Sequence, residues 1–507
     1  MLQGYAVPDV RAAEDRVRAG LAEGELMMRA ARGLADVVAQ RVRQRGAGPV
    51  VVLAGPGDNG GDALHAAALL ADELGEHGAG RPRVEAVGVA RRLHEGGLEA
   101  ARSAGLPVHL VDPDEDDLPG DVADLLGRAD VVVDGLLGIG GRPGLRGVMA
   151  RVVDAVPGTA YLVSADLPSG ADPEGRQIPA AAVFADETVT FGMLKPVHLL
   201  PGGEPAVGRL TVVDIGVPMD VAPTVERLEA ADVSRWWPMP VPADHKYSRG
   251  VVGVVAGSEA YPGAAVLCVT AAVQAGAGMV RYLGPRRAED LVLAACPEAV
   301  PGPGRMQAAV VGPGVEPQGG DHPDGEDQQA RAVRELLAEE VPLVVDAGGL
   351  TILAWWLAEG HLRTAPTLLT PHAGELARLL STARDAEVTR EQVEEDPLAH
   401  ARRAAAMTGC TVLLKGSTTL VVDPDPAVPA RSQADAPAWL ATAGAGDVLA
   451  GVAGTLLAAG LPPRDAGALA ALVHGMAAHR ANPGGPVRAM DVARALPGTI
   501  ADLLRRA

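Results

Sequence analysis

Short apolar runs alternate with helical patterns along the first half of the chain. Apolar strands separated by helices are typical of a parallel sheet that is covered on both faces. A helical stretch is expected before the first strand, at residues 8–44, and another helix from about Asp62, after a glycine loop at 55–61. The first half is therefore predicted to be a three-layer α/β domain. Its strands are expected at residues 49–54, 83–88, 130–134, 160–165, 187–191 and 209–214.

The strand–helix rhythm stops at residues 216–245, which are rich in proline, and then begins again. Proline-rich segments without periodic structure commonly separate domains, so we place a boundary near residue 225 and predict domains at 1–225 and 226–507. The second domain is again predicted to be three-layer α/β, with an acidic surface loop at 316–329. Its strands are expected at 250–256, 279–284, 308–312, 342–346, 366–370, 411–415 and 419–423, and helices at 263–276, 446–459 and 465–481, the last two closing the chain.

Composition limits the kind of protein that this chain can be. At 507 residues it is too long for one core, and its net charge of −20 argues against nucleic acid or an anionic membrane as the main partner. No apolar run reaches the roughly 20 residues that a membrane-spanning helix needs. The cysteines Cys268, Cys296 and Cys410 form no CxxC pair and are expected to be buried core residues in a reducing compartment. These features favour a cytoplasmic enzyme.

Arginine greatly outnumbers lysine, and asparagine is rare. The lysines are Lys195, Lys246 and Lys415, and the asparagines are Asn59 and Asn482. The ammonium group of lysine is compact and the guanidinium group of arginine is wide, so the two bind differently at a tight site. In a chain that uses arginine almost everywhere, a lysine therefore indicates a position where arginine cannot replace it. Asn59 and the three lysines all lie in or beside the motifs described next.

Three predicted strands of the first half end in loops that carry glycine and acidic residues. The first strand is followed by Gly55 to Asp62, a glycine-rich turn that could bind phosphate or be only a tight turn. Asp134 and Asp166 end two further strands. A single acid in such a place often only caps the next helix. Because ligands bind at the carboxyl ends of strands in open α/β sheets, the three loops are predicted to meet at one pocket.

The motifs GPGDNGGDA, VDGLLGIGG, ADLPSG and TVTFGMLKP, in this order, resemble the NAD(P)HX epimerase family over residues 1–215. NAD(P)HX denotes the hydrated forms of NADH and NADPH. The resemblance implies a Rossmann-like fold and Asp166 as the acid–base residue. It implies K⁺ bound by Asn59, Asp134 and Ser169. It also implies a substrate site made of Asp58, Asn59, Gly60, Gly61, Asp62, Gly138, Ile139, Gly140, Gly141, Arg142, Pro143 and Gly144.

Departures from this family's pattern are few. Asp58 replaces an asparagine and adds negative charge beside the expected pyrophosphate, while Ala63 replaces a glycine and Met28 a glutamate. Lys195 could pair with a phosphate or with Asp186, and the sequence does not choose between the two.

In the second half, the segment Ala441 to Asp447 opens a predicted helix with the sequence ATAGAGD. Glycines at a helix start can hold a phosphoryl group, and the aspartate can take a proton from an attacking hydroxyl. The alternative is a glycine-rich turn with an aspartate cap. Lys415 to Thr419 offers a cation, backbone donors and hydroxyls to a nucleotide, and His372 follows another strand.

Together these motifs resemble the ADP-dependent NAD(P)HX dehydratase family over residues 240–507. The resemblance implies a ribokinase-like fold and a reaction in which ADP phosphorylates the added hydroxyl before phosphate leaves, with Mg²⁺ balancing the ADP charge. It implies Asp447 as the base. Substrate contacts are expected at Ala264, Gly314, His372 and Asp447, and ADP contacts at Lys415, Gly416, Ser417, Thr418, Thr419 and Gly446.

The second motif set also departs from its family. Ala443 replaces a glycine, Thr418 stands where glycine is common, and Gly348 stands where an acid is common. The predicted function is repair of NADHX and NADPHX with ADP as co-substrate, and resemblance to both families implies a homo-oligomer. Two alternatives stay open: a ribokinase-like small-molecule kinase fused to a nucleotide-binding module, and a first domain that serves only as an interaction module.

Overall fold

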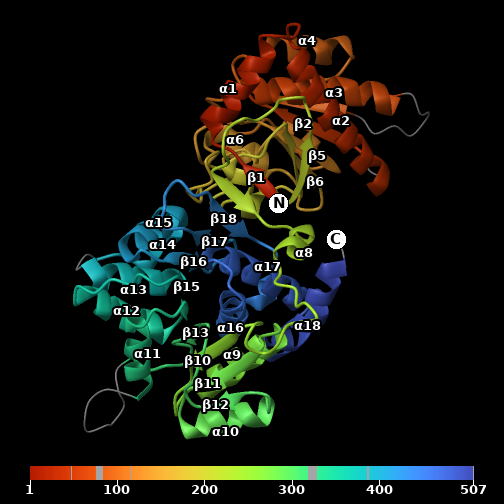
Figure 1. Ribbon diagram of the computed structural model, residues 1–507. Helices are drawn as coiled ribbons and strands as arrows, with labels where there is room; N and C mark the ends of the chain where they lie inside the picture. The colour runs from red at the N-terminus through yellow and green to blue at the C-terminus, as the bar shows by residue number, and fades with distance from the viewer. Residues whose placement is uncertain (47, 76–83, 116, 318–327, 385–386, 506–507) are drawn as a thin grey trace. The chain divides into compact units, whose positions relative to one another are not determined.

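The structure is a computed structural model that describes residues 1–46, 48–75, 84–115, 117–317, 328–384 and 387–505. Its contacts divide the chain into two compact units. The first unit is Gln3–Val225, and the second is Glu226–Ala507 together with Met1–Leu2. Figure 1 traces the chain from its red beginning to its blue end.

The sheet of the first unit has seven strands in the order β4-β3-β2-β5-β6-β7-β8, and every pairing is parallel. The order reverses between β2 and β5, as in doubly wound nucleotide-binding folds, whose ligands bind at that point. The α/β prediction is therefore confirmed. The strands are β2 (Val50–Ala54), β3 (Val84–Val89), β4 (Val108–Val111), β5 (Val131–Gly135), β6 (Tyr161–Ala165), β7 (Glu187–Phe191) and β8 (Arg209–Val213).

Helices cover both faces of this sheet. Alternate residues of β2 belong to different core clusters, Val50 and Val52 to one and Val51 and Leu53 to the other, so the unit has three layers. The helices are α1 (Val7–Arg18), α2 (Glu25–Arg45), α3 (Asp58–Gly75), α4 (Glu95–Ser103), α5 (Gly120–Leu126), α6 (Gly147–Asp154), η1 (Pro196–His198) and α7 (Glu204–Val207).

The helical stretch predicted at 8–44 is confirmed, and it consists of two helices, α1 and α2. Gly24, just before α2, adopts a left-handed conformation with φ of 76°. Helix α3 begins at Asp58 and not near Asp62, so residues 58–62 form a first helical turn instead of a loop. The backbone N–H groups at a helix start point along its axis, which suits an anionic ligand.

The larger sheet runs in the order β1-β9-β18-β17-β16-β15-β14-β13-β10-β11-β12. Strands β10 to β16 pair in parallel, while β16, β17 and β18 pair antiparallel. Its strands are β1 (Leu2–Gly4), β9 (Val225–Arg227), β10 (Val251–Val255), β11 (Met279–Tyr282), β12 (Val300–Pro301), β13 (Ala308–Val311), β14 (Leu343–Val345), β15 (Thr367–Leu369), β16 (Thr411–Leu414), β17 (Thr419–Val422) and β18 (Ala430–Gln433).

Helices α11 to α15 gather on one side of this sheet, and α9, α16, α17 and α18 on the other (Figure 1). The chain closes on α18 and not on the two helices predicted. Most of the acidic segment, residues 318–327, lies outside the described residues, but its last two residues already begin α11. The helices are η2 (Ala230–Asp232), α8 (Val233–Trp236), α9 (Pro262–Gln274), α10 (Arg286–Ala295), α11 (Gln328–Ala338), α12 (Gly348–Ala358), α13 (Ala373–Arg384), α14 (Arg390–Glu395), α15 (Pro397–Thr408), η3 (Ala438–Leu440), α16 (Ala445–Ala458), α17 (Pro463–Ala481) and α18 (Ala489–Arg505).

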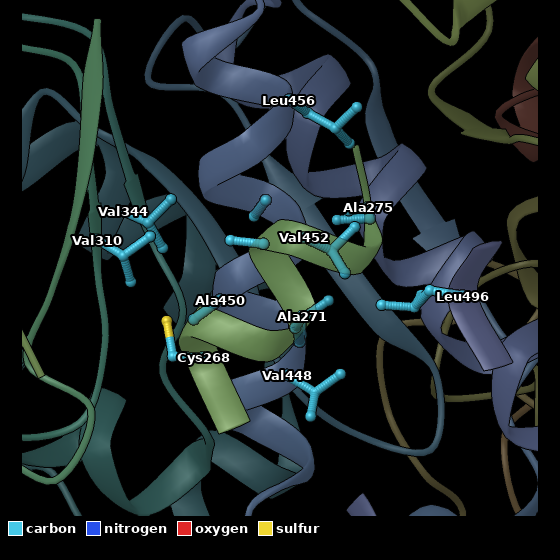
Figure 2. Packing of buried hydrophobic residues seen from close by; sticks show 14 of the residues in the cluster. Cys268, Ala271, Ala275, Val310, Val344, Val448, Ala450, Val452, Leu456 and Leu496 are labelled. Carbon is cyan, nitrogen blue, oxygen red and sulfur yellow. The ribbon is translucent and has the colours of Figure 1, made fainter. Parts of the chain in front are cut away.

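Helix α16 lies in the core of the second unit, between the sheet and α9 (Figure 2). It is apolar on every side, as a helix enclosed by other elements must be. Small residues permit the close packing. A side chain at Gly451 would collide with the backbone of Cys268, and one at Gly454 would collide with Val310. The tight packing holds the start of α16, where Asp447 lies, in one position.

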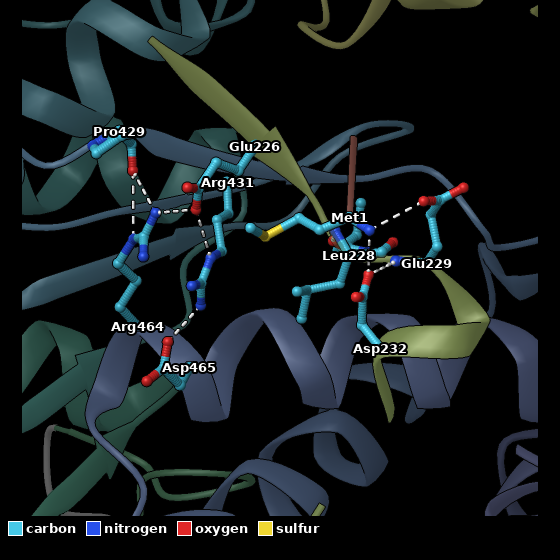
Figure 3. Close-up of polar contacts among 10 residues, drawn as sticks. Met1, Glu226, Leu228, Glu229, Asp232, Pro429, Arg431, Arg464 and Asp465 are labelled. Carbon is cyan, nitrogen blue, oxygen red and sulfur yellow. Dashed lines mark hydrogen bonds and ion pairs between the residues drawn. The ribbon is translucent and has the colours of Figure 1, made fainter. Parts of the chain in front are cut away.

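The first residues of the second unit are fixed by charged side chains (Figure 3). Glu226 accepts hydrogen bonds from Arg431, at 3.2 Å, and from Arg464, at 2.7 Å. Arg431 also pairs with Asp465 and lies over the ring of Trp236. Both guanidinium groups are therefore satisfied although they are largely buried, as buried charges require.

Two further predictions bear on the kind of protein. Within the described ranges, no helix combines the length and the apolar composition that crossing a membrane requires. The three cysteines are free and buried, which confirms their expected place in the core.

Candidate active sites

A cavity of about 1320 Å³ opens in the first unit where the strand order reverses. The start of α3, the loop after β5 and the end of β6 form it, together with α1 and α2. Glycines allow the turns after β2 and β5 to approach. A side chain at Gly55 would collide with the carbonyl oxygen of Leu136, and one at Gly138 would lie 3.0 Å from Cβ of Asn59.

The structure brings most of the predicted residues of the first unit to this cavity. Gly60 and Gly61 lie in the same helical turn as Asp62. Arg142, Pro143 and Gly144 continue the loop after β5 but are not among the lining residues. Those that line the cavity are Asp58, Asn59, Asp62, Gly138, Ile139, Gly140, Gly141 and Asp166.

The predicted potassium ligands converge below the cavity. Ser169 donates through Oγ to Oδ1 of Asp134, at 2.6 Å, and through its backbone N–H to Oδ2, at 2.9 Å. Asn59 donates through Nδ2 to the carbonyl oxygen of Leu137, at 3.0 Å, and the N–H of Leu137 donates to Ser169 Oγ. Oδ1 of Asn59 is buried and, among the described residues, has no hydrogen-bond partner. A buried amide oxygen without a hydrogen-bond partner suits a hard cation.

Asp166 lies at the end of β6 with φ of 63°, a conformation that a residue other than glycine rarely adopts. Its carboxylate pairs with the ammonium group of Lys195 and accepts a hydrogen bond from Thr190 at 3.1 Å. Nε2 of His198 bonds the carbonyl oxygen of Asp166 at 2.8 Å. Strain of this kind persists only where surrounding contacts enforce it, and it gathers at functional sites.

The protonation states around Asp166 follow from these contacts. Burial alone would raise the pKa of Asp166, but attraction to Lys195 and its hydrogen bond hold the pKa below its usual value. Burial lowers the pKa of His198 to about 4, so its ring is neutral and Nδ1 can accept the N–H of Lys195. Asp166 is thus held ionised. The contact between Lys195 and Asp166 was not predicted. The predicted alternative, a pair between Lys195 and Asp186, is wrong, because the ammonium group of Lys195 pairs with Asp166. The carboxylate of Asp186 accepts the N–H of Leu162.

The second site lies at the carboxyl ends of the parallel strands β10, β13, β14, β15 and β16. The last residues of β10, β13, β14 and β15 are in register, and β16 extends two residues beyond Val412, the partner of Leu369. Lys415, after β16, donates to Asp346, after β14, at 2.8 Å. Its ammonium lies 3.6 Å from the carboxylate of Glu375. Asp346 is buried and accepts a further hydrogen bond from Thr370 at 2.9 Å. Asp346 and Glu375 were not singled out from the sequence.

Asp447 lies in the first turn of α16, near this charged cluster. Burial and the carboxylates of Asp346 and Glu375 together raise its pKa to about 7, against the opposing effect of Lys415. A Cβ added at Gly446 would lie 3.4 Å from the ammonium nitrogen of Lys415, so the helix start and the lysine face each other. A carboxyl with a pKa near neutrality is suited to exchange protons with a substrate hydroxyl.

The other predicted residues of the second unit lie at the ends of neighbouring strands. Nδ1 of His372 accepts the N–H of Gly374 at 3.1 Å, and the N–H of His372 donates to Glu375 at 2.9 Å. A Cβ at Gly314 would lie 2.7 Å from that of Ala264. The turn between β16 and β17 contains Gly416, Ser417 and Thr418, and Thr419 begins β17.

Two family models match the chain. One is described as YjeF-related protein N-terminus and matches residues 23–197, and the other is described as NAD(P)H-hydrate dehydratase and matches residues 252–497. A bifunctional NAD(P)H-hydrate repair enzyme from Mycobacterium tuberculosis is 42% identical over 92% of this chain and 91% of its own length. The chain belongs to the family of bifunctional NAD(P)H-hydrate repair enzymes. A member from Corynebacterium glutamicum is 34% identical over 90% of this chain and 87% of its own.

Solved structures with a similar second unit include an ADP/ATP-dependent NAD(P)H-hydrate dehydratase from Bacillus subtilis, crystallised with ATP and Mg²⁺. It is 23% identical with a TM-score of 0.47 and covers 55% of this chain and 99% of its own. A ribokinase-like superfamily protein from Enterococcus faecalis is 21% identical with a TM-score of 0.47, over 56% of this chain and 99% of its own. The family expected from the motifs of both halves is thus confirmed by the family models and the full-length relatives.

Proposed function

We propose that this chain restores hydrated NADH and NADPH in two steps. Residues 1–225 interconvert the R and S forms of NAD(P)HX, and residues 226–507 dehydrate the S form with ADP, giving NAD(P)H, AMP and phosphate. The observation that carries the proposal is that one chain of this family holds two separate acid-bearing sites, each at the carboxyl ends of its own sheet. The proposed setting is the cytoplasm, and the proposed assembly is a homo-oligomer.

In the first site, the N–H groups at the start of α3 and the glycine loop at 138–144 bind the pyrophosphate, and Asp166 faces the hydrated ring. Its carboxylate, held ionised by Lys195, accepts the proton of the ring hydroxyl. Potassium would be held by Asn59, Asp134 and Ser169. The bound cation supplies fixed positive charge below the substrate, and the buried Oδ1 of Asn59 supports this assignment.

In the second site, Asp447 takes the proton from the substrate hydroxyl as that oxygen attacks the β-phosphoryl group of ADP. Lys415 and the N–H groups at the start of α16, around Gly446, stabilise the charge on the phosphoryl group. Phosphate then leaves the ring carbon as the neighbouring carbon loses a proton to solvent, and the electron pair of that C–H bond re-forms the ring double bond. This elimination is easy because phosphate is a far better leaving group than hydroxide. Ala264, Gly314 and His372 line the dinucleotide side of the site.

Magnesium is the proposed partner of the ADP phosphates. It needs oxygen ligands and is commonly held by one or two carboxylates together with phosphates and water. Asp346 and Glu375 would supply carboxylates beside Lys415. Among the described residues no cluster of three or more acids, histidines or cysteines forms a complete metal cage, which fits a cation that arrives with its nucleotide.

The function is tested with a mixture of both epimers of hydrated NADH, the protein, Mg²⁺ and K⁺. Absorbance of the reduced nicotinamide is followed with and without ADP. Full ADP-dependent recovery is expected from the unaltered chain. Asp166→Asn should restore reduced nicotinamide only from the share of the mixture present as the S form, apart from what slow spontaneous epimerisation adds. Asp447→Asn should restore none. Absence of recovery with either ADP or ATP would refute repair and favour a small-molecule kinase.

Potassium is tested separately. Asn59→Leu keeps the side-chain volume but removes the free oxygen. Epimerisation by the unaltered chain should rise when K⁺ replaces tetramethylammonium, and the variant should lose that rise while dehydration of the S form is unchanged. Equal stimulation of both proteins would exclude Asn59 as a potassium ligand.

A further inference from the structure

A second carboxyl group, that of Asp62, lines the same cavity as Asp166. Asp62, in the first turn of α3, lines the same cavity as Asp166 and Glu14 of α1. Its Oδ1 is buried and has no hydrogen-bond partner within the described parts of the chain. Asp166, by contrast, has its carboxylate paired with Lys195. Two carboxyl groups of one cavity thus differ sharply in their partners.

This difference sets their protonation states apart. Burial raises the pKa of Asp62 well above its usual value, and the negative charges of Asp166, Asp58 and Glu14 raise it further, opposed by Lys195. The same lysine lowers the pKa of Asp166 below its usual value. Asp62 therefore holds its proton more tightly than Asp166 does, and carboxyl groups whose pKa values are pushed apart in this way can act as an acid and a base.

The chemistry of the hydrated ring needs such a pair. Water adds to an enamine with its oxygen on the carbon that bears nitrogen, so the hydrate is a carbinolamine. Its configuration inverts when the bond between that carbon and nitrogen breaks and re-forms on the other face. Opening requires loss of the hydroxyl proton and gain of a proton by nitrogen, and one base and one acid can act together on these adjacent atoms.

We propose that Asp62 is the proton donor of the epimerisation, acting on the ring nitrogen while Asp166 takes the hydroxyl proton. The carbon–nitrogen electron pair leaves with nitrogen, which receives the Asp62 proton, and the hydroxyl oxygen becomes a carbonyl oxygen. The aldehyde turns its other face to nitrogen, the ring closes, and both protons return. No oxidant or reductant is needed. This inference rests on the proposed epimerase function of the first unit.

Glu14 is the competing donor in the same cavity. Burial raises its pKa as well, and Asp166 and Asp15 raise it further, but Lys195 and Arg18 oppose them. Asp166, Asp58 and Glu14 each raise the pKa of Asp62 by more than Lys195 lowers it. Asp62 also lies in the first turn of α3, which lines the cavity. Further charged or titratable groups of the cavity are Arg11, Glu23, Glu25, His65, His94 and Glu95.

Asp62→Asn removes the acidic proton and keeps the shape. We expect kcat for epimerisation to fall about 100-fold to 10,000-fold with KM nearly unchanged, as for loss of a general acid. Asp72→Asn makes the same change on an exposed position of the same helix and should leave kcat unaltered. ADP-dependent dehydration of the S form reports whether the second unit is folded, and an unchanged KM for epimerisation reports that the first unit still forms its site. Full epimerisation by Asp62→Asn beside an active unaltered chain would overturn this inference alone, whereas an inactive unaltered chain would overturn the proposed function.

The pH profile separates a donor from a structural residue. With Asp62 as donor, kcat falls as pH rises through the raised pKa of that carboxyl, and this limb is absent from the residual activity of Asp62→Asn. Glu14→Gln removes a negative charge that raises the pKa of Asp62. In this variant the fall of kcat should therefore begin at a lower pH, and kcat should be unchanged at pH values below that fall. If Glu14→Gln loses as much activity as Asp62→Asn at every pH, the donor is not Asp62.

Discussion

Replacing Asp447 by asparagine should abolish ADP-dependent dehydration and, at the same time, stabilise the fold. The carboxyl of Asp447 has a pKa raised to about 7 by burial, Asp346 and Glu375. The folded chain therefore binds its proton more tightly than the unfolded chain, whose aspartates titrate near 4. Stability falls as pH rises between these two values, and the full cost is present above the folded pKa.

The magnitude follows from the two pKa values. A tenfold difference in proton affinity is worth about 1.4 kcal/mol, so the cost approaches roughly 4 kcal/mol at pH 8 but only about 1.5 kcal/mol at pH 5. Partial exposure of the side chain reduces both figures. We expect Asp447→Asn to gain about 1–3 kcal/mol at pH 8 and clearly less at pH 5.

The assay is equilibrium unfolding of the full chain in urea at pH 5 and pH 8. Asp290→Asn is the matched control, because Asp290 makes only an exposed ion pair with Arg286 and should change stability by less than about 0.5 kcal/mol. A second internal reference is epimerisation by the first unit, which should be unaffected. A loss of stability in Asp447→Asn, or an equal gain at both pH values, would refute the reasoning.

Three further substitutions test separate features of the structure. Lys415→Met should lower ADP-dependent dehydration at least about 100-fold, because the phosphoryl charge loses its cation, while epimerisation persists; comparable losses of both activities would contradict this. Arg41→Met leaves the fully buried carboxylate of Glu187 without its cation and should cost about 3–5 kcal/mol in urea unfolding, and a cost below 1 kcal/mol would be inconsistent with the buried pair. Gly55→Ala should abolish epimerisation and lower the melting temperature, because its Cβ meets a backbone oxygen, whereas Gly57→Ala has open space and should keep its melting temperature.

Strand prediction succeeded where a strand is a run of mostly apolar residues and failed where polar residues interrupt the run. Strands such as β2 and β10 are continuous apolar runs and were predicted within a residue or two. Strand β4 lies at the sheet edge with Leu110 exposed, so its sequence VHLV carries no comparable signal. Strand β18 buries Arg431, Ser432 and Gln433, whose polar groups find partners that are distant in sequence.

The sites were predicted in part, and what the predictions missed has a common cause. Asp166 and Asp447 stand in local motifs that glycines make recognisable. Lys195 contacts Asp166, which is 29 residues away in the sequence, and Lys415 contacts Asp346, which is 69 residues away. No local sequence pattern can predict either pair. The scarcity of lysine was the one sequence signal that pointed to both, since each lysine in a site persists in a chain rich in arginine.

The sequence alone determined the two α/β units, the glycine turns at their strand ends and the family, because these depend on residues near one another in the chain. The tertiary structure decided which charges meet. Burial and Coulomb interactions between distant residues lower the pKa of Asp166 and raise those of Asp62 and Asp447, and a sequence motif fixes none of these shifts. Local sequence motifs identified which acids lie in the sites. Folding shifted the pKa values of these acids, and the chemistry depends on those shifts.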